Sequence, residues 1–219
     1  KQLDVTKAPA LRSLYCGKSE LSSLNVTQCP NLVSLSCNGT NLTQINLSKN
    51  TELLSLSIQG NSHFDSINLS ANVKLTDLYF QNCKLASLDV SMLPNLDRLV
   101  CSRNQLTKLD VRQNKKLRVL DCGFNPITSL DLTQNTKLVS LEAKDVSVNS
   151  IQLNSENLNY LTCYPKDGIM EVDVGNCPKI RRTLYEYDSE QPNSTGYVGY
   201  SMGYDTSVYF DLRSVRLKR

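Results

Sequence analysis

Eight cysteines are the residues of this chain with the most versatile chemistry, because a thiolate can act as a nucleophile, a metal ligand or a disulfide partner. Five of them recur at one position of a repeating pattern, and other repeats fill that position with Ile58, Phe80 and Ala143. A position shared with hydrophobic residues indicates small buried thiols, whereas zinc ligands converge on one point from different directions. The five are Cys16, Cys37, Cys101, Cys122 and Cys163.

Two cysteine pairs would lie on adjacent turns, Cys16 beside Cys37 and Cys101 beside Cys122. Adjacent strands are close enough for a disulfide, but side chains that point the same way fit its dihedral angle poorly. We therefore expect reduced thiols and leave the oxidation of these two pairs open. The remaining cysteines occupy turn positions that other repeats give to Asn, and these are Cys29, Cys83 and Cys177.

A second column of polar residues recurs at about 21-residue intervals and is expected to face outward. One interpretation is a strip that binds cations, since stacked carboxylates repel each other unless something neutralises them. However, Lys108 and Arg112 flank Asp110, and many Ser and Thr residues lie nearby as hydrogen-bond donors, so we predict no metal site. The column consists of Asn25, Asn46, Asn68, Asp89, Asp110, Asp131, Gln152 and Asp173.

Asp121 and Glu142 fall on neighbouring strands and resemble the acid and base of a glycoside hydrolase. A flat sheet offers no pocket to shift their pKa values or to exclude water, so we predict no enzyme activity and no cofactor. His63 is the one histidine, and it falls where a repeat has gained a residue. No partner for it is evident in the sequence, and we expect a loop residue.

The elements that must position these residues are short strands in a repeat of about 21 residues. The clearest copies are LDRLVCSRNQLTKLDVRQNKK and LRVLDCGFNPITSLDLTQNTK. In each half of a repeat, apolar residues alternate at spacing two, which is typical of a strand with one inward face, and neither gap fits a helix. Eight turns end at Lys179 and open at Leu11, Leu32, Leu53, Leu75, Leu96, Leu117, Leu138 and Leu158.

Such turns bury their apolar faces only by stacking, so the pattern predicts a flattened solenoid with a parallel sheet on each side. Neighbouring strands lie roughly 4.8 Å apart, which makes eight turns about 40 Å long. Because strands lie on both sides, we expect shallow curvature. Inward asparagines should bond the backbone of their own turn and the next, and these are Asn61, Asn104, Asn125, Asn50, Asn72, Asn114 and Asn135.

These repeats resemble the bacterial leucine-rich repeats of the nested 21-residue class, including the Cys-bearing repeats of an internalin, a surface adhesin. The resemblance covers residues 1 to about 180. It implies an all-β-rich leucine-rich-repeat solenoid that recognises another molecule outside the cell or on the surface of a bacterium. It does not identify the ligand, since one fold serves many functions.

The outward positions of the first strands are the expected binding surface. Their mixed tyrosine, arginine and carboxylate composition suits a protein or glycan ligand, because aromatic and Arg side chains supply most interface energy. The alternative is a solvated sheet face in a structural spacer or scaffold that positions a neighbouring domain. The candidate residues are Tyr15, Asp77, Tyr79, Arg98, Asp121, Glu142, Lys144, Tyr160 and Tyr164.

After residue 180 the repeat fails, and residues 181–219 hold six of the ten tyrosines. We predict a solenoid domain over residues 1–180, and residues 181–219 are either a β-rich cap on its last turn or the start of a truncated following domain. A free-standing domain of about 40 residues is rare.

The net charge and the lengths of the apolar stretches limit the classes of partner. A formal net charge of +3 with scattered basic residues argues against nucleic-acid binding, and no stretch approaches the roughly 20 apolar residues of a membrane-spanning helix. The chain opens at Lys1 with the repeat already in register, so we expect a processed or excised product whose export signal has been removed. We expect a monomer.

Overall fold

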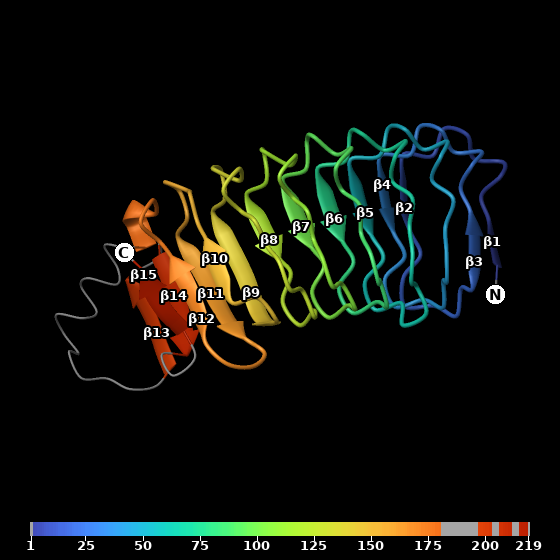
Figure 1. Cartoon of the computed structure of the whole chain (residues 1–219). Coiled ribbons are helices and arrows are strands. Elements are labelled where there is room, and N and C mark those ends of the chain that lie inside the picture. The colour runs from blue at the N-terminus through green and yellow to red at the C-terminus, as the bar shows by residue number, and fades with distance from the viewer. Residues whose placement is uncertain (1, 181–196, 203–205, 212–214, 219) are drawn as a thin grey trace.

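The computed structural model describes residues 2–180, 197–202, 206–211 and 215–218 of the 219. The chain coils through successive turns into an elongated solenoid, with its amino-terminal turns at one end (Figure 1). This confirms the prediction of about eight stacked 21-residue turns built from short parallel strands. In the described part of the chain, no helix is long and apolar enough to cross a membrane.

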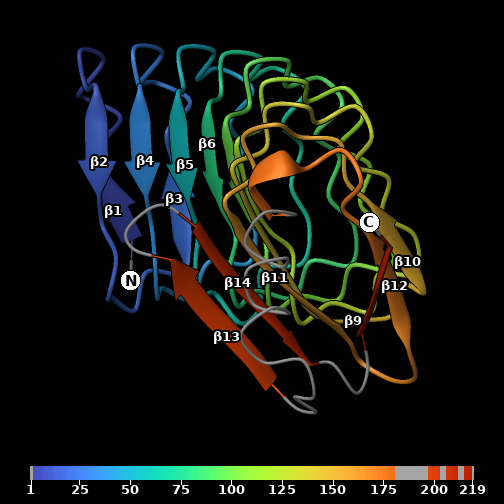
Figure 2. The ribbon, with the colours of Figure 1, turned by 90° about the vertical axis from the view of Figure 1, so that its left-hand side faces the viewer.

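The first strands of the eight turns, together with two carboxyl-terminal strands, form one ten-stranded sheet, which is parallel except for its last strand. Each strand pairs with the next in the same register, so that Leu35 lies beside Leu56 and Leu99 beside Leu120. Figure 2 shows the amino-terminal strands side by side. From one edge to the other the strands are β2 (Ser13–Tyr15), β4 (Ser34–Ser36), β5 (Ser55–Ser57), β6 (Asp77–Tyr79), β7 (Arg98–Val100), β8 (Val119–Asp121), β9 (Ser140–Val146), β11 (Tyr160–Pro165), β14 (Thr206–Asp211) and β13 (Tyr197–Met202).

The opposite side of the solenoid differs from the expected continuous second sheet. Among the residues that the structure describes, backbone ladders form on this side only at its two ends, between β1 (Gln2–Asp4) and β3 (Ser23–Asn25), and among β10 (Ser150–Gln152), β12 (Met170–Asp173) and β15 (Val215–Lys218). In the intervening turns, the second half of each repeat, which we term the second segment, has no strand pairing. The leucines of the second segments still point inward, so hydrophobic burial, and not ladder hydrogen bonding, fixes these segments.

The cysteine column lies inside the solenoid as predicted, and all eight cysteines are free thiols. Cys37, Cys101, Cys122 and Cys163 are fully buried. Cys16 is partly exposed because the first strand has a sheet neighbour on one side only. The other occupants of the column are buried too, and Phe80 stacks on Phe64 with 6.2 Å between the ring centroids.

The inward asparagines hydrogen-bond the backbone, which confirms their structural role. The neighbouring turn that they bond is, however, the preceding turn. Asn104 Nδ2 donates to the Phe80 and Cys101 carbonyls at 2.7 and 2.9 Å, and its Oδ1 accepts the Leu85 N–H at 3.0 Å. These partners belong to its own turn and the preceding turn, not to the following one. On the other side, Asn114 Nδ2 donates at 2.9 Å to the carbonyls of Val90 and Leu93, again in the preceding turn. Neighbouring turns are therefore bonded through side chains as well as strands.

The carboxyl-terminal strands extend both sides of the solenoid. β14 pairs parallel with β11, and β15 pairs parallel with β12. β13 then lies antiparallel against β14 at the edge of the large sheet. The division at residue 180, with a cap or a following domain beyond it, stays a prediction, and much of the segment that it concerns lies outside the described residues.

Candidate functional site

The outward residues of the first strands form a surface that we term the first-strand face. Each candidate alternates with an inward leucine or core residue of its strand, which is why the sheet presents it to solvent. All of these side chains are half-buried among their neighbours except Tyr15, which is 72% exposed. The candidates lie on this face as the alternation predicts, and their role in binding stays a prediction. They are Tyr15, Asp77, Tyr79, Arg98, Asp121, Glu142, Lys144, Tyr160 and Tyr164.

Three of the candidates meet on β6 and β7. Arg98 Nε lies 3.6 Å from Asp77 Oδ1, and Tyr79 follows Asp77 on the same strand, close enough for both charged groups to shift its pKa. Burial raises the pKa of Tyr79, Arg98 lowers it and Asp77 raises it, so the phenol remains protonated at neutral pH. Beside them, Arg118 forms two bonds with Asp97, at 2.5 and 2.8 Å, a pair that sequence reasoning missed.

A second group gathers on β8, β9 and β11. Lys144 Nζ lies 2.7 Å from Glu142 Oε2, and the strand register places Tyr164 beside Lys144. Tyr160 also lies close enough to Lys144 to raise its pKa slightly. Asp121 adjoins Glu142 in register, and burial raises the pKa of its carboxyl group. The solenoid therefore brings five candidates from three turns into one polar and aromatic patch.

Tyr15 stands apart from both groups. It lies on β2, three strands from Tyr79 in the sheet order, which corresponds to roughly 14 Å. Its hydroxyl lies 3.4 Å from Ser34 Oγ, and the turns between carry the small residues Ser36 and Ser57. The structure thus separates Tyr15 from the remaining candidates.

The two carboxyl groups considered as an acid and base each have other partners. Asp121 accepts hydrogen bonds from Ser102 Oγ at 2.7 Å and from the Gly123 N–H at 3.3 Å. Glu142 is bound by Lys144. His63 is an exposed turn residue whose Nδ1 lies 3.2 Å from Ser62 Oγ, in agreement with the loop expectation.

Side chains of the outward polar column hydrogen-bond their own turns. Asn25 Oδ1 accepts the N–H of Thr27 at 3.0 Å, and Asp110 Oδ1 accepts the N–H of Arg112 at the same distance. Such Asx turns form because a short Asn or Asp side chain reaches the backbone two residues on. No group of three or more His, Cys, Asp or Glu residues suited to a metal ion occurs in the described chain. Equivalent bonds are made by Asn46, Asn68, Asp89, Asp131 and Asp173.

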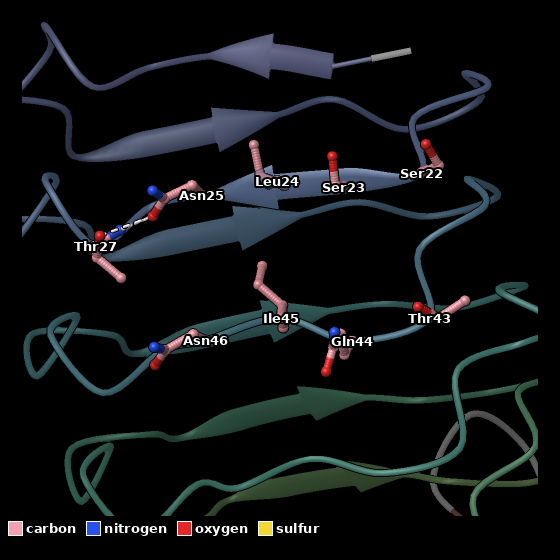
Figure 3. A pocket seen from close by; sticks show the side chains of 9 residues that line it. All are labelled: Ser22, Ser23, Leu24, Asn25, Thr27, Thr43, Gln44, Ile45 and Asn46. Carbon is pink, nitrogen blue, oxygen red and sulfur yellow. Dashed lines mark hydrogen bonds between the residues drawn. The ribbon is translucent and has the colours of Figure 1, made fainter.

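Shallow hollows recur on the side of the solenoid opposite the ten-stranded sheet. Figure 3 shows one of about 470 Å³, in which Leu24 and Ile45 from adjacent turns flank the opening and Asn25 bonds Thr27. Two further hollows, of about 440 and 220 Å³, adjoin it on either side and share lining residues with it. Each of these hollows spans only two adjacent turns and repeats the surface shape of its neighbour, so we assign them no ligand.

Sequence reasoning missed a shallow, open groove at the end of the first strands, lined by glycines and polar residues. Its volume is about 650 Å³, and it crosses five consecutive turns. Each turn contributes a residue in the left-handed backbone conformation there, for example Gly39 with φ 62° and Arg103 with φ 57°. The recurrence of Gly39, Gly60 and Asn82 was the available signal, since Gly and Asn tolerate this conformation best. The lining residues are Lys18, Asn38, Gly39, Gln59, Gly60, Gln81, Asn82 and Arg103.

Comparison with known proteins agrees with this architecture. A sequence-family model described as Leucine Rich repeats (2 copies) matches residues 94–134, which include β7 and β8. Two of its repeats therefore match the leucine-rich-repeat family, and the solenoid as a whole has the leucine-rich-repeat fold. No curated protein sequence gives a significant match to this solenoid.

Solved structures resemble the leucine-rich-repeat solenoid more extensively. The functional domain of InlJ from Listeria monocytogenes, whose description notes a cysteine ladder, is 25% identical with a TM-score of 0.65, over 82% of this chain and 50% of that one. An internalin, InlF, from the same species is 20% identical with a TM-score of 0.66, over 80% and 55% of the two chains. The ectodomain of the plant receptor kinase GASSHO1/SCHENGEN3 from Arabidopsis thaliana, solved in complex with CASPARIAN STRIP INTEGRITY FACTOR 2, is 17% identical with a TM-score of 0.55, over 77% and 29%. The solenoid spans about half the length of the two internalins.

Proposed function

We propose that this solenoid is a non-catalytic recognition module that binds a protein or glycan through its first-strand face. The observation that carries the proposal is the grouping of Tyr79, Asp77 and Arg98 on adjacent strands, next to the patch that contains Lys144 and Tyr160. Aromatic and arginine side chains that a rigid sheet already holds in place lose little conformational entropy on binding. Such residues dominate the energy of protein interfaces.

The surroundings of the face support recognition over catalysis. The carboxylates at its centre are engaged by arginine, lysine or hydroxyl partners. Leucine-rich repeats act in protein recognition, and the plant receptor ectodomain with the same fold was solved with a bound factor. We therefore assign the chain a binding role without a cofactor.

We further propose an extracellular location on the surface of a bacterium, where the module contributes to adhesion as a monomer. The support is the similarity to InlJ and InlF of Listeria monocytogenes. The net charge of +3 gives no strong field toward nucleic acid, so a protein or glycan partner fits the surface better.

An array of glycans and host-surface proteins tests the proposal. The intact chain is compared with a triple variant, Tyr79→Ala, Arg98→Ala and Tyr160→Ala, in which three side chains of the first-strand face are truncated. A ligand of this face should lose binding at least tenfold in the variant, since two or three truncated interface side chains typically cost more than about 1.4 kcal/mol.

The matched control truncates three exposed side chains on other sides of the solenoid, Gln44→Ala, Lys108→Ala and Gln113→Ala. It should bind as the intact chain does, and both variants should melt within a few degrees of it. If a folded, monodisperse intact chain binds nothing on the array, the recognition proposal is wrong and the scaffold alternative takes its place.

A further inference from the structure

The groove at the ends of β2 and β4–β7 is continuous across the first five turns and distinct from the first-strand face. None of its lining residues belongs to the candidate set of that face. The groove runs across the strands, because each successive turn adds one left-handed residue to its floor, from Lys18 to Arg103. Four turn spacings separate these two residues, or about 19 Å. A ligand that fills this groove must be elongated.

The side chains along the groove are amides that retain hydrogen-bonding capacity. Neither Gln59 nor Asn82 uses its side-chain amide to hydrogen-bond another described residue. Asn38 Oδ1 accepts bonds from Ser57 Oγ at 2.7 Å and the Gln59 N–H at 2.9 Å, which leaves its Nδ2 as a donor. Gln81 Nε2 donates to Ser102 Oγ at 3.0 Å, which leaves its Oε1 as an acceptor. The groove therefore offers both donors and acceptors of hydrogen bonds.

The groove is also basic at both ends. Lys18 and Arg103 line it, no lining residue carries a carboxylate, and neither side chain forms an ion pair with a described residue. Elsewhere on the solenoid, Lys74, Arg112 and Arg118 are each paired with a carboxylate. The Arg103 guanidinium lies 4.2 Å from the centre of the Phe124 ring, which holds it beside the groove.

We propose that this groove binds an acidic polysaccharide, a chain of sugars that carries carboxylates. Sugar hydroxyls both donate and accept hydrogen bonds, as do the side-chain amides of Gln59 and Asn82, whereas the carboxylate side chains of an acidic peptide only accept and its donors are confined to the backbone. Lys18 and Arg103 bind two carboxylates of the same chain through charge-assisted bonds. This second site does not depend on the function proposed for the first-strand face.

Isothermal titration with oligogalacturonate, an oligomer of uronic acid long enough to span four turns, tests the proposal. The intact chain should bind it and should bind its methyl-esterified form at least tenfold more weakly. The double variant Lys18→Gln and Arg103→Gln keeps side-chain length and should also lose at least tenfold. Gln59→Met, which removes one amide without a change in charge, should lose about threefold to tenfold.

A charge-matched control removes two exposed lysines that do not line the groove and are not near its lining residues in the sequence, Lys49→Gln and Lys108→Gln, and should bind within twofold of the intact chain. The first-strand variant with Tyr79, Arg98 and Tyr160 truncated should also retain oligogalacturonate binding, which separates this proposal from the preceding one. No binding by the folded intact chain at millimolar oligomer would overturn it. Equal binding of polyglutamate of the same charge, or an equal loss in the charge-matched control, would show that net charge alone acts and would overturn it as well.

Discussion

Cys16 Sγ lies 3.1 Å from Cys37 Sγ, where the first two turns of the solenoid stack. Cys37 is fully buried, and burial together with the neighbouring thiol raises its pKa, whereas Cys16 is partly exposed. Cys101 and Cys122 occupy the same positions of later turns, and both are fully buried; Cys122 Sγ is directed to the Glu142 carbonyl at 3.7 Å, as Cys16 Sγ is to the Ser36 carbonyl at 3.6 Å. The first turn is therefore the part of the cysteine column that reagents can reach.

We expect Cys16 to be the first of the eight thiols to react with iodoacetamide in the native protein. The others are buried, and burial raises the pKa of Cys122 to about 12, so few of them are thiolates near neutral pH. Mass spectrometry of tryptic peptides after brief labelling measures the order. Cys16→Ser should abolish the early product, and early labelling of Cys101 or Cys122 would show that the column is open.

The substitution Asn114→Ala removes two hydrogen bonds that join one turn to the preceding one. It leaves the buried carbonyls of Val90 and Leu93 without these partners, which should lower the free energy of unfolding by about 2–4 kcal/mol. Urea unfolding measures the loss. Gln113→Ala, one residue earlier and exposed, is the control and should change stability by less than about 0.5 kcal/mol. Equal stability of the two variants would refute the structural role of the asparagine row.

Leu109 tests the register of the second segments, which have no ladder hydrogen bonds in the central turns. Leu109 is 4% exposed, so Leu109→Asp would bury an unpaired carboxylate and should abolish the cooperative thermal transition. The adjacent Lys108→Asp places the same charge on an exposed position and should retain that transition. A cooperative melt of the Leu109 variant close to that of the intact chain would mean that this residue faces outward.

Acid should destabilise the solenoid through its outward aspartates. The hydrogen bond from Arg112 lowers the pKa of Asp110 to about 2, and Ser91 and Thr133 lower the pKa values of Asp89 and Asp131 in the same way. A carboxyl group whose pKa is lower in the folded than in the unfolded state stabilises the fold above its unfolded pKa, near 4. That contribution is lost as the pH falls from about 4 to 2, and solvent screening keeps it small.

The free energy of unfolding at pH 5 and at pH 2 measures this effect. A triple variant, Asp89→Asn, Asp110→Asn and Asp131→Asn, keeps the turn hydrogen bonds through its amide oxygens, as Asn46 does in its own turn. It should lose less stability than the intact chain between the two pH values. An identical loss in both proteins would assign the acid sensitivity to other groups.

The 21-residue spacing of leucines and the period-two alternation within each half-repeat determined the fold from sequence. Leu99 and Leu120 lie in adjacent strands because an inward leucine in every turn can be buried only by stacking in phase. The same argument placed the cysteine column inside and the candidates of the first-strand face outside. A one-residue slip would have reversed both assignments, and for this reason the sequence pattern was decisive.

Tertiary structure decided which outward residues meet and which backbone groups pair. The Asp77–Arg98 contact, the isolation of Tyr15 and the groove from Lys18 to Arg103 depend on side-chain direction and on left-handed residues, neither of which hydrophobic periodicity specifies. The sequence likewise predicted a second sheet where the central turns instead use Asn114 and the Asx turns. Burial of apolar residues sets the period of a solenoid, but the pairing of its polar groups follows local geometry that is established only once the turns have stacked.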